Sequence, residues 1–580
     1  MKKFCIAALV LAVTGMVSAR TLTVKFGSAM EVEIDGAVRK FAKGETFDPT
    51  AIPCLYRMRP ANMSENERTF CIEGTEFIRG KDVYRRFPQY GEGNWVRVAL
   101  DPYPVDDTTV TLTARKTSNF FYVDAEHGND DWDGTADYDH RDEQSLKGPK
   151  KTLQSAHDAA TGDYPIVFAA PGVYDSGVAT NYSSSGAGRC IRRLIATKSN
   201  IGFIATKGAK ETFIVGSPDL SSGGNGDEAV AGVYMQADYQ QFLQGFTITG
   251  CYSPAEQSKS IQYGIGFCSG ARRAYCLDCV ISNNYAVTQG PATYYGVIER
   301  SWIMENESLQ FTTRDGVFVS CVFAGNKLTM SDSTSNNRAL QQSAQSYFCT
   351  YDMRRGNPLS GGRKRIEDGD SILRTALVCG LTEKSTTTTN AARWCDSKAI
   401  DNPLFVDAAA RDYRLQIQSP AIDVSSYKDD LNGEARMVMT SDIYGNARVM
   451  NGAIDLGAVE YDWRPAFARA VGKKIEIEEM SSSVTTNAAG GLFVPSGAIA
   501  GKAIVKGLYE FAFTVAGGTL EAFCSGESVG VRSSPGEHVF RMDMQETGEK
   551  FRFVFTPAEE GGYALFKRAL HCRGIAITVK

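Results

Sequence analysis

The sequence is poor in the features that mark several common protein classes. It has five histidines, and none lies between His157 and His538. No phosphate loop, dinucleotide fingerprint or serine nucleophile elbow is present. After the first residues, no apolar run approaches the roughly 20 residues that a transmembrane helix needs. Charges of one sign do not cluster and the formal net charge is −5, so we expect no nucleic-acid partner and no transmembrane segment.

The first 19 residues have the order of a secretory signal peptide. Lys2 and Lys3 precede an apolar run from Phe4 to Val17, and Ala19 stands before Arg20. A basic start, an apolar middle and small residues at the end are typical of a cleaved leader. We therefore expect residues 1–19 to be removed and the protein to be exported through the secretory pathway, to the cell surface or the medium.

Changes in composition divide the rest of the chain into three parts. Short alternating runs separated by polar turns predict an N-terminal β-sandwich at residues 20–116 and a C-terminal β-sandwich at 464–580. Between them, at 117–463, strand follows strand. In an exported protein the pairs Cys54/Cys71 and Cys524/Cys572 are expected to form disulfides, with buried free thiols as the alternative.

One amphipathic helix is expected before the long run of strands, at residues 151–160. Thr152 is a suitable N-cap, Leu153 and Ala156 fall on one face, and Gly162 ends the helix. A single helix at this place suits a cap, because the first coil of a β-solenoid would otherwise expose its core and its edge.

A repeat in the central part predicts the architecture. Short apolar segments recur with a common third residue, and these markers are separated by 33, 22, 20, 25 and 30 residues: Ile248, Ile281, Ile303, Phe323, Phe348 and Val378. Spacings of this size with variable insertions are typical of parallel β-helix coils, each too small to bury its apolar face alone.

Three residues beyond the marker, successive coils carry Asn284, Asn306 and Asn326. Stacked amides can hydrogen-bond from coil to coil, so this constant offset predicts an asparagine ladder, with three unrelated turn residues as the alternative. Cysteines at matching positions, such as Cys279 and Cys321, are expected to be small buried residues in the same stacks.

Two stretches resemble known families. Tyr122-Val123-Asp124 to Asp133-Gly134, together with Ala170-Pro171-Gly172-Val173-Tyr174, resembles the opening coil of right-handed β-helix proteins of the pectin-lyase-like fold. Asp401-Asn402-Pro403-Leu404-Phe405-Val406-Asp407 and Asp455-Leu456-Gly457-Ala458-Val459-Glu460-Tyr461 resemble the closing segment of choice-of-anchor Q domain proteins. The resemblance covers residues 119–461 and implies a right-handed parallel β-helix there. Together with the two sandwiches predicted from the residue pattern, the expected fold is all-β, with a right-handed parallel β-helix flanked by N- and C-terminal β-sandwich domains. The chain departs from the anchor layout because it continues well beyond Tyr461.

An acidic, glycine-containing loop near residue 124 is a candidate calcium site. Asp124, Asp130, Asp131 and Asp133 would supply the hard oxygen ligands that Ca²⁺ prefers. The spacing does not match a helix-loop-helix calcium site. The alternative is that these carboxylates cap backbone amides in turns.

Candidate catalytic residues follow from what each chemistry needs. A polysaccharide lyase needs a group that neutralises the sugar carboxylate and a base, and without histidines the candidates are Arg314, with Asp315 beside it, and Lys327 on a shared exposed face. A glycosidase needs two carboxylates about 5–10 Å apart. The possible donors are Asp278, Glu299, Glu305 and Asp315. For each of them the alternative is an ordinary solvated charge.

The sequence therefore predicts a secreted or cell-surface β-helix protein that interacts with extracellular polysaccharide or the cell envelope. A polysaccharide lyase or glycoside hydrolase acting on a lateral groove of the helix is the first alternative. A structural or adhesion protein without sugar affinity is the second. Aromatic side chains alone on that groove would favour binding, whereas clustered carboxylates and arginines with perturbed acidities would favour an enzyme.

Overall fold

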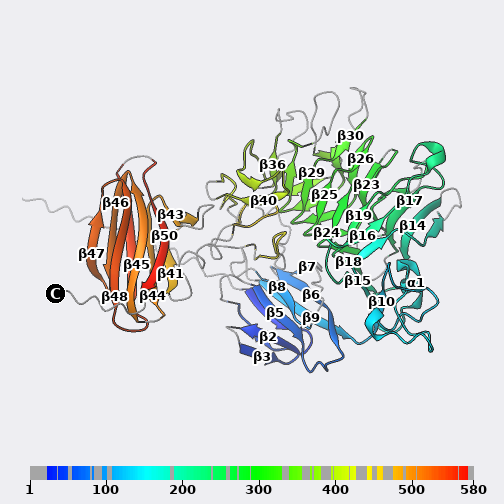
Figure 1. The fold of residues 1–580 in the computed structure, drawn as a ribbon, viewed down its shortest axis with the longest axis horizontal. Coiled ribbons are helices and arrows are strands. Elements are labelled where there is room, and N and C mark those ends of the chain that lie inside the picture. Colours follow the sequence, from blue (N-terminus) through cyan, green and yellow to red (C-terminus); the bar gives the residue numbers. More distant parts are fainter. Residues whose placement is uncertain are drawn as a thin grey trace, which may run out of the picture.

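The structure is a computed structural model (Figure 1). It describes residues 22–572 apart from 35–36, 50–54, 79–80, 84–93, 101–107, 183–188, 237–239, 256–261, 271–273, 288, 330–338, 356–365, 369–370, 381–393, 396, 417–418, 423, 426–440, 447, 449–453, 462–474, 482, 487–491, 505 and 559–560. The predicted signal peptide lies outside the described residues. Within them, no helix has the length and apolar character needed to span a bilayer.

The central part winds into a right-handed parallel β-helix with three long sheets, which confirms the fold class predicted from the sequence. The ten-stranded sheet consists of β10 (Phe120–Val123), β11 (Ile166–Ala169), β15 (Gly202–Ala205), β18 (Gln241–Gln244), β21 (Ala274–Leu277), β24 (Val297–Glu299), β28 (Val317–Val319), β32 (Gln345–Tyr347), β35 (Ile372–Arg374) and β37 (Trp394–Cys395). The nine-stranded sheet consists of β12 (Gly172–Tyr174), β16 (Thr212–Val215), β19 (Thr247–Thr249), β22 (Val280–Ser282), β25 (Trp302–Met304), β29 (Val322–Ala324), β33 (Thr350–Asp352), β36 (Leu377–Cys379) and β38 (Lys398–Ala399). The eight-stranded sheet consists of β13 (Ala179–Tyr182), β14 (Arg189–Ala196), β17 (Val230–Met235), β20 (Phe267–Ser269), β23 (Gln289–Tyr294), β27 (Phe311–Arg314), β31 (Ala339–Gln342) and β34 (Glu367–Asp368).

The repeat markers lie in register in the nine-stranded sheet, with one exception. Ile248, Ile281, Ile303 and Phe323 are paired in succession along β19, β22, β25 and β29. The next residue of this row is Tyr351, not Phe348, so that marker was wrong. Phe348 has a φ of 53° and belongs to the turn before β33. The true strand, Thr350–Asp352, is hidden in the sequence because a threonine and an aspartate flank its tyrosine.

The asparagine ladder is confirmed. The Nδ2 atoms of Asn284 and Asn306 each donate a hydrogen bond of 3.0 Å to Oδ1 of the next asparagine. All three side chains are buried, with at most 3% of their surface exposed. The amide oxygens also accept from the backbone N–H of the preceding coil, so the four coils from Cys251 to Asn326 are fixed to one another in the interior.

The described cysteine side chains of the helix are buried thiols, as the repeat predicted. Cys279, Cys321 and Cys349 lie at equivalent turn positions before β22, β29 and β33 and are fully buried, and Ser301 takes this position in the coil between the first two. The expected disulfide between Cys524 and Cys572 is wrong, because Cys524 is a free thiol. Cys54 lies outside the described residues, so its pairing with Cys71 stays a prediction.

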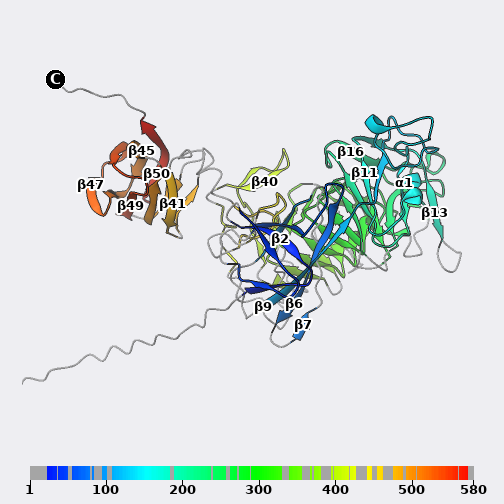
Figure 2. The same ribbon diagram turned by 90° about the horizontal axis from the view of Figure 1, so that it is seen from below.

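The predicted helix is present as α1 (Leu153–Ala159), with Thr152 as its N-cap. Two short 3-10 helices, Tyr138–His140 and Leu220–Ser222, lie in loops. Leu153 and Ala156 pack into the core of the first coils, among residues such as Phe121 and Val123. The helix therefore covers the end of the hydrophobic core, as Figure 2 shows beside β11.

The N-terminal part is a β-sandwich. Its five-stranded sheet consists of β4 (Thr46–Phe47), β1 (Leu22–Phe26), β9 (Thr108–Thr117), β6 (Arg68–Ile78) and β7 (Lys81–Val83), and its four-stranded sheet of β3 (Ala37–Phe41), β2 (Met30–Ile34), β5 (Leu55–Pro60) and β8 (Val96–Ala99). Strand β6 also contacts the helix. The Phe70 ring lies 5.0 Å from that of Tyr164 and 5.4 Å from that of Phe242, so the sandwich covers the outer face of the ten-stranded sheet (Figure 1).

The segment after the last coils folds back over the nine-stranded sheet. It contains the hairpin β39 (Phe405–Asp407) and β40 (Asp412–Leu415). Tyr413 from this hairpin, with Leu456 and Val459, packs on Val322 and Leu377 of β29 and β36. The apolar outer face of the nine-stranded sheet is thereby removed from water.

The C-terminal part is a second β-sandwich. One five-stranded sheet consists of β41 (Ile475–Met480), β44 (Gly497–Ala503), β49 (Lys550–Pro557), β46 (Gly518–Cys524) and β47 (Glu527–Arg532), and the other of β42 (Thr485–Thr486), β43 (Leu492–Val494), β50 (Tyr563–Cys572), β45 (Gly507–Ala516) and β48 (Gly536–Met544). Phenylalanines at alternate positions of facing strands fill its core. The predicted domain limits at 116/117 and 463/464 stay predictions.

Candidate functional site

Among the described residues, neither hydrophobic cluster formed by the flanking segments on the β-helix includes the eight-stranded sheet. In the described part of the chain, the cluster containing Phe70 takes its helix residues from the ten-stranded sheet and its turns. The cluster containing Tyr413 takes its helix residues from the nine-stranded sheet. Neither includes a residue of the eight-stranded sheet. Functional side chains of the helix are therefore sought on the outside of this sheet, which we call the lateral face.

A row of outward positions runs across the strands of the lateral face. The register pairs Tyr234 with Cys268, then Cys268 with Tyr294, Tyr294 with Arg314, and Arg314 with Gln342. Neighbouring parallel strands lie about 4.8 Å apart, so these side chains stand beside one another. Two tyrosines, the thiol of Cys268, a guanidinium and a primary amide thus form one strip, in which Cys268 and Tyr294 are buried and the other members are partly exposed.

Arg314 is the centre of this strip. Its guanidinium carbon lies 5.4 Å from the ring centroid of Tyr263 and 5.9 Å from that of Tyr294. Its Nη1 donates to Oε1 of Gln289 at 2.7 Å, and its Nε donates to Oδ2 of Asp315 at 3.2 Å. The side chain keeps 30% of its surface exposed, so it is held in place but still open to solvent.

The tyrosines around Arg314 form a compact aromatic group. The ring of Tyr294 is 5.3 Å from that of Tyr263 and 4.4 Å from that of Tyr295. Burial and the hydroxyl of Tyr295 both raise the pKa of Tyr294 above its ordinary value. Tyr294 is therefore a neutral hydrogen-bonding phenol at physiological pH, and it is a poor proton acceptor.

The structure brings together Arg314 and Asp315 but does not join them to Lys327. Asp315 has a φ of 55° and occupies the turn that follows β27. Lys327 lies in a separate pair of short strands, β26 (Glu307–Ser308) and β30 (Lys327–Leu328), opposite Glu307. Within the described residues, no hydrogen bond or ion pair connects Lys327 to Arg314.

Asp278 and Glu299 meet at another corner of the helix, through Arg300. Arg300 Nε donates to Oδ1 of Asp278 at 2.7 Å, and its Nη1 contacts Oε1 of Glu299. Burial alone would lower the pKa of Arg300, but the two carboxylates raise it above its ordinary value. Glu299 is only 1% exposed whereas Asp278 keeps 36% of its side chain exposed, so the ion-pair network is open to solvent at one of its two carboxylates and does not offer a pair of accessible carboxylates.

Glu305, the remaining candidate donor, lies apart from these groups. It pairs with Arg411 at 3.1 Å and with Arg355 at 3.9 Å. Arg411 lies in the turn between β39 and β40. Glu305 therefore takes part in holding the closing hairpin against the helix.

The acidic loop places its carboxylates on backbone amides. Oδ1 of Asp124 accepts from the N–H of Glu126 and His127, Oδ1 of Asp130 from Lys151 and Thr152, and Oδ1 of Asp133 from Thr135 and Gly148. Asp131 is exposed. Across the described residues, no group of three or more His, Cys, Asp or Glu side chains could hold a metal ion. These contacts are those of the turn-capping alternative, and the calcium site stays a prediction.

Sequence reasoning missed the aromatic partners of Arg314. Gln289 and Tyr294 lie in β23, whereas Arg314 lies in β27 and Tyr263 precedes β20, so only the strand register brings these residues to one place. The available signal was the Tyr294-Tyr295 pair ahead of a turn glycine, a short motif that is uninformative without the register.

Comparison with known proteins gives similarity of fold at low identity. No protein family profile matches the chain, and no curated protein matches it. Among solved structures, the pectate lyase Pel9A aligns with 14% identity and a TM-score of 0.32, over 59% of this chain and 96% of its own. The secreted serine protease VesC from Vibrio cholerae aligns with 14% identity and a TM-score of 0.15, over 19% of this chain and 26% of its own. The enzymatically active domain of tailspike protein 4 from bacteriophage CBA120 aligns with 12% identity and a TM-score of 0.14, over 70% of this chain and 63% of its own. Likenesses this weak assign no activity to this chain.

Proposed function

We propose that this protein is an exported, glycan-binding β-helix protein that holds an extended extracellular polysaccharide on its lateral face. The observation that carries the proposal is the arrangement of the partly exposed Arg314 between Tyr263 and Tyr294, on the long sheet that shares neither flanking cluster among the described residues. Export rests on the signal peptide predicted at residues 1–19.

The chemistry of the strip suits a sugar ligand. Tyrosine rings offer flat apolar surfaces for the C–H faces of sugar rings, and their hydroxyls form hydrogen bonds. A guanidinium can bind a sugar carboxylate through two parallel hydrogen bonds. The repeated strand spacing of about 4.8 Å extends these contacts along the helix axis, as an extended polymer requires.

Binding is favoured over catalysis by the state of the candidate groups. A general base works best with a pKa near the working pH, and the pKa of Tyr294 is shifted away from it. Asp315, the carboxylate beside Arg314, is engaged in an ion pair with that arginine. A lyase or a glycosidase on this face therefore has less support than a binding protein.

The resemblance of the closing segment to choice-of-anchor Q domains supports surface attachment. In this chain the segment packs on the nine-stranded sheet through Tyr413, Leu456 and Val459. We propose that it closes the helix and leaves the lateral face free for the cell envelope or a surrounding polysaccharide.

Binding to a panel of acidic and neutral polysaccharides, measured by isothermal titration calorimetry, tests the proposal. Arg314→Gln and Tyr263→Ala are expected to weaken binding about tenfold or more, because each removes a partly exposed side chain of the lateral face. The matched control is Arg541→Gln, which removes an equal charge from an exposed ion pair with Glu510 on the C-terminal sandwich. Unchanged affinity in both lateral-face variants would overturn the proposal.

The same incubations also distinguish binding from catalysis. Ultraviolet-absorbing unsaturated products would reveal elimination, and new reducing ends without such products would reveal hydrolysis. We expect neither to accumulate. If the wild-type protein forms either product and Arg314→Gln does not, the lateral face is catalytic and the binding proposal is wrong.

A further inference from the structure

The outer surface of the C-terminal sandwich contains a depression of about 590 Å³. It lies on the sheet formed by β41, β44, β49, β46 and β47. We call it the C-terminal trough and define it by Glu479, Ala500, Phe523, Lys550, Arg552 and Val554.

The floor and walls of the trough follow from the strand register. Glu479 pairs with Ala500, Ala500 with Arg552, and Arg552 with Phe523, so these four side chains form one row across four strands. Ala500 is small, which lowers the surface between its neighbours. The register shift between Ile477 and Glu479 places an extra residue in β41, and such a bulge bends the strand.

The charged side chains of the trough differ in whether they have an ion-pair partner. Glu478 at its rim is paired with Lys502 at 2.9 Å and with Lys550 at 3.7 Å. Arg552, by contrast, has no ion pair or side-chain hydrogen bond to any described residue, although it stands in the middle of the sheet. An unpaired guanidinium beside an aromatic ring in a depression is suited to an anionic ligand with a flat apolar face.

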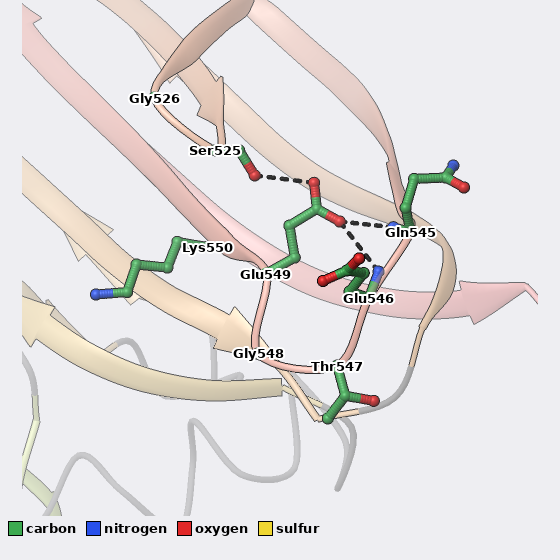
Figure 3. Close-up of a pocket in the computed structure, with 8 residues that line it drawn as sticks. All are labelled: Ser525, Gly526, Gln545, Glu546, Thr547, Gly548, Glu549 and Lys550. Atoms are coloured by element: carbon green, nitrogen blue, oxygen red, sulfur yellow. Dashed lines mark hydrogen bonds between the residues drawn. The ribbon is translucent and has the colours of Figure 1, made fainter.

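A neighbouring depression of about 650 Å³ has no guanidinium beside an aromatic ring among its lining residues. Figure 3 shows its centre, where the Glu549 carboxylate accepts from the Ser525 hydroxyl and from the backbone N–H of Gln545 and Glu546. These groups satisfy one another and stabilise the turn between β48 and β49. The side chain of Lys550 extends away from that turn.

We infer that the C-terminal trough is a second glycan-binding site, specific for a sugar that carries a carboxylate. Arg552 binds the carboxylate, the ring of Phe523 packs on the sugar's C–H face, and Glu479 accepts hydrogen bonds from sugar hydroxyls. The site is built from a different domain than the lateral face and does not depend on binding there.

An acidic sugar fits the trough better than an acidic peptide does. Glu478, Glu479 and Glu521 lie on the same outer surface as Arg552. A segment of successive aspartates or glutamates would bring its charges against these carboxylates, whereas sugar hydroxyls can donate to them. One carboxylate per sugar, with hydroxyls on either side, matches one guanidinium with carboxylates on either side.

The test is calorimetric titration of the purified full chain with short oligomers of glucuronic, galacturonic and mannuronic acid. Arg552→Gln and Phe523→Ala are expected to weaken one binding event about tenfold or more. The matched control, Arg541→Gln, lies on the other sheet of the same sandwich and is expected to have no effect. Methyl-esterified oligomers, which lack the charge, are expected to bind weakly to this site.

Combination with Arg314→Gln separates this inference from the lateral-face proposal. If Arg314→Gln still binds uronate oligomers and the added substitution Arg552→Gln abolishes that binding, the remaining site is the C-terminal trough. Two results would overturn the inference. One is equal affinity of Arg552→Gln and Arg541→Gln for the uronate oligomers. The other is the loss of all uronate binding in Arg314→Gln alone. Equal or tighter binding of poly-glutamate at Arg552 would overturn the assignment to a sugar.

Discussion

Asn306 donates through Nδ2 to Oδ1 of Asn326 at 3.0 Å, while its own Oδ1 accepts from Asn284 at the same distance. Its amide also donates to the carbonyl of Ile281 at 2.9 Å. One side chain thus satisfies polar groups of the coils on both sides of it in a region without water access.

Asn306→Ala is expected to destabilise the β-helix by roughly 3 kcal/mol, because it leaves buried donors and acceptors of two neighbouring coils unpaired. Chemical denaturation followed by circular dichroism measures this. Glu307→Ala, at the next and partly exposed position, serves as the control and should change the free energy of unfolding little. Equal stabilities of the two variants would show that the ladder contributes no more than a surface residue.

Arg300→Ala is expected to cost about 3–5 kcal/mol, because the buried carboxylate of Glu299 would lose its ion pair with the guanidinium. Lowering the pH allows that carboxylate to be protonated, so the difference from the wild-type protein should shrink in acid. Urea denaturation at several pH values measures both effects. Asp278→Asn, which keeps the guanidinium beside Glu299, should be milder at neutral pH. A cost independent of pH would point to lost packing instead.

Asp352 links β33 to the closing hairpin and predicts an acid-sensitive step. Burial raises its pKa, but bonds from Arg354 and the Tyr413 hydroxyl outweigh burial and hold the pKa below its ordinary value. Its stabilising contribution is therefore fully present above the unfolded pKa of about 3.9 and is lost as the pH falls through the lower folded value. Asp352→Asn should remove this dependence and cost roughly 1.5–3 kcal/mol at neutral pH. Unfolding curves that keep the same acid slope in the variant would contradict this assignment.

Thiol alkylation should separate Cys524 from the other described cysteines. Cys524 is partly exposed, whereas the other nine with described side chains are buried. Burial and the nearby Glu549 raise the pKa of Cys524, so its reaction is expected to be slow at neutral pH and faster in alkali. Iodoacetamide labelling followed by peptide mass spectrometry measures this site by site. Modification of Cys279 or Cys321 in the folded protein at a similar rate would contradict the packed core.

The sequence was sufficient for features that repeat locally and insufficient for features that form between distant segments. The constant offset of Asn284, Asn306 and Asn326 predicted their contacts, because identical local geometry repeats in each coil. The packing of Phe70 on Phe242 has no local signature, since it joins segments far apart in the chain. Composition and compartment suggested a disulfide at Cys524, but the thiol is free, because spacing along the chain does not decide which cysteines meet in the fold.

In the candidate site, too, the sequence predicted the local features and missed the contacts between distant segments. Arg314 and Asp315 were identified because charged residues after a strand are exposed in a turn. Their aromatic neighbours depended on which coil follows which, and the incorrect marker at Phe348 shows how easily a coil can be misplaced. Arg300 was overlooked although it binds both Asp278 and Glu299, since a charged residue in a turn usually faces solvent.

The segments before and after the β-helix cover the outer faces of two different sheets, and this affects how the chain folds as it is made. The N-terminal sandwich, made first, packs on strands that emerge later, and the closing segment packs on coils that already exist. A nascent chain that ends before residue 400 would have wound its coils but would still present Val322 and Leu377 to solvent. Newly made chains therefore pass through a stage in which this apolar sheet face is exposed. Rapid synthesis of the closing segment, or a chaperone that binds over Val322 and Leu377, would protect such chains from aggregation.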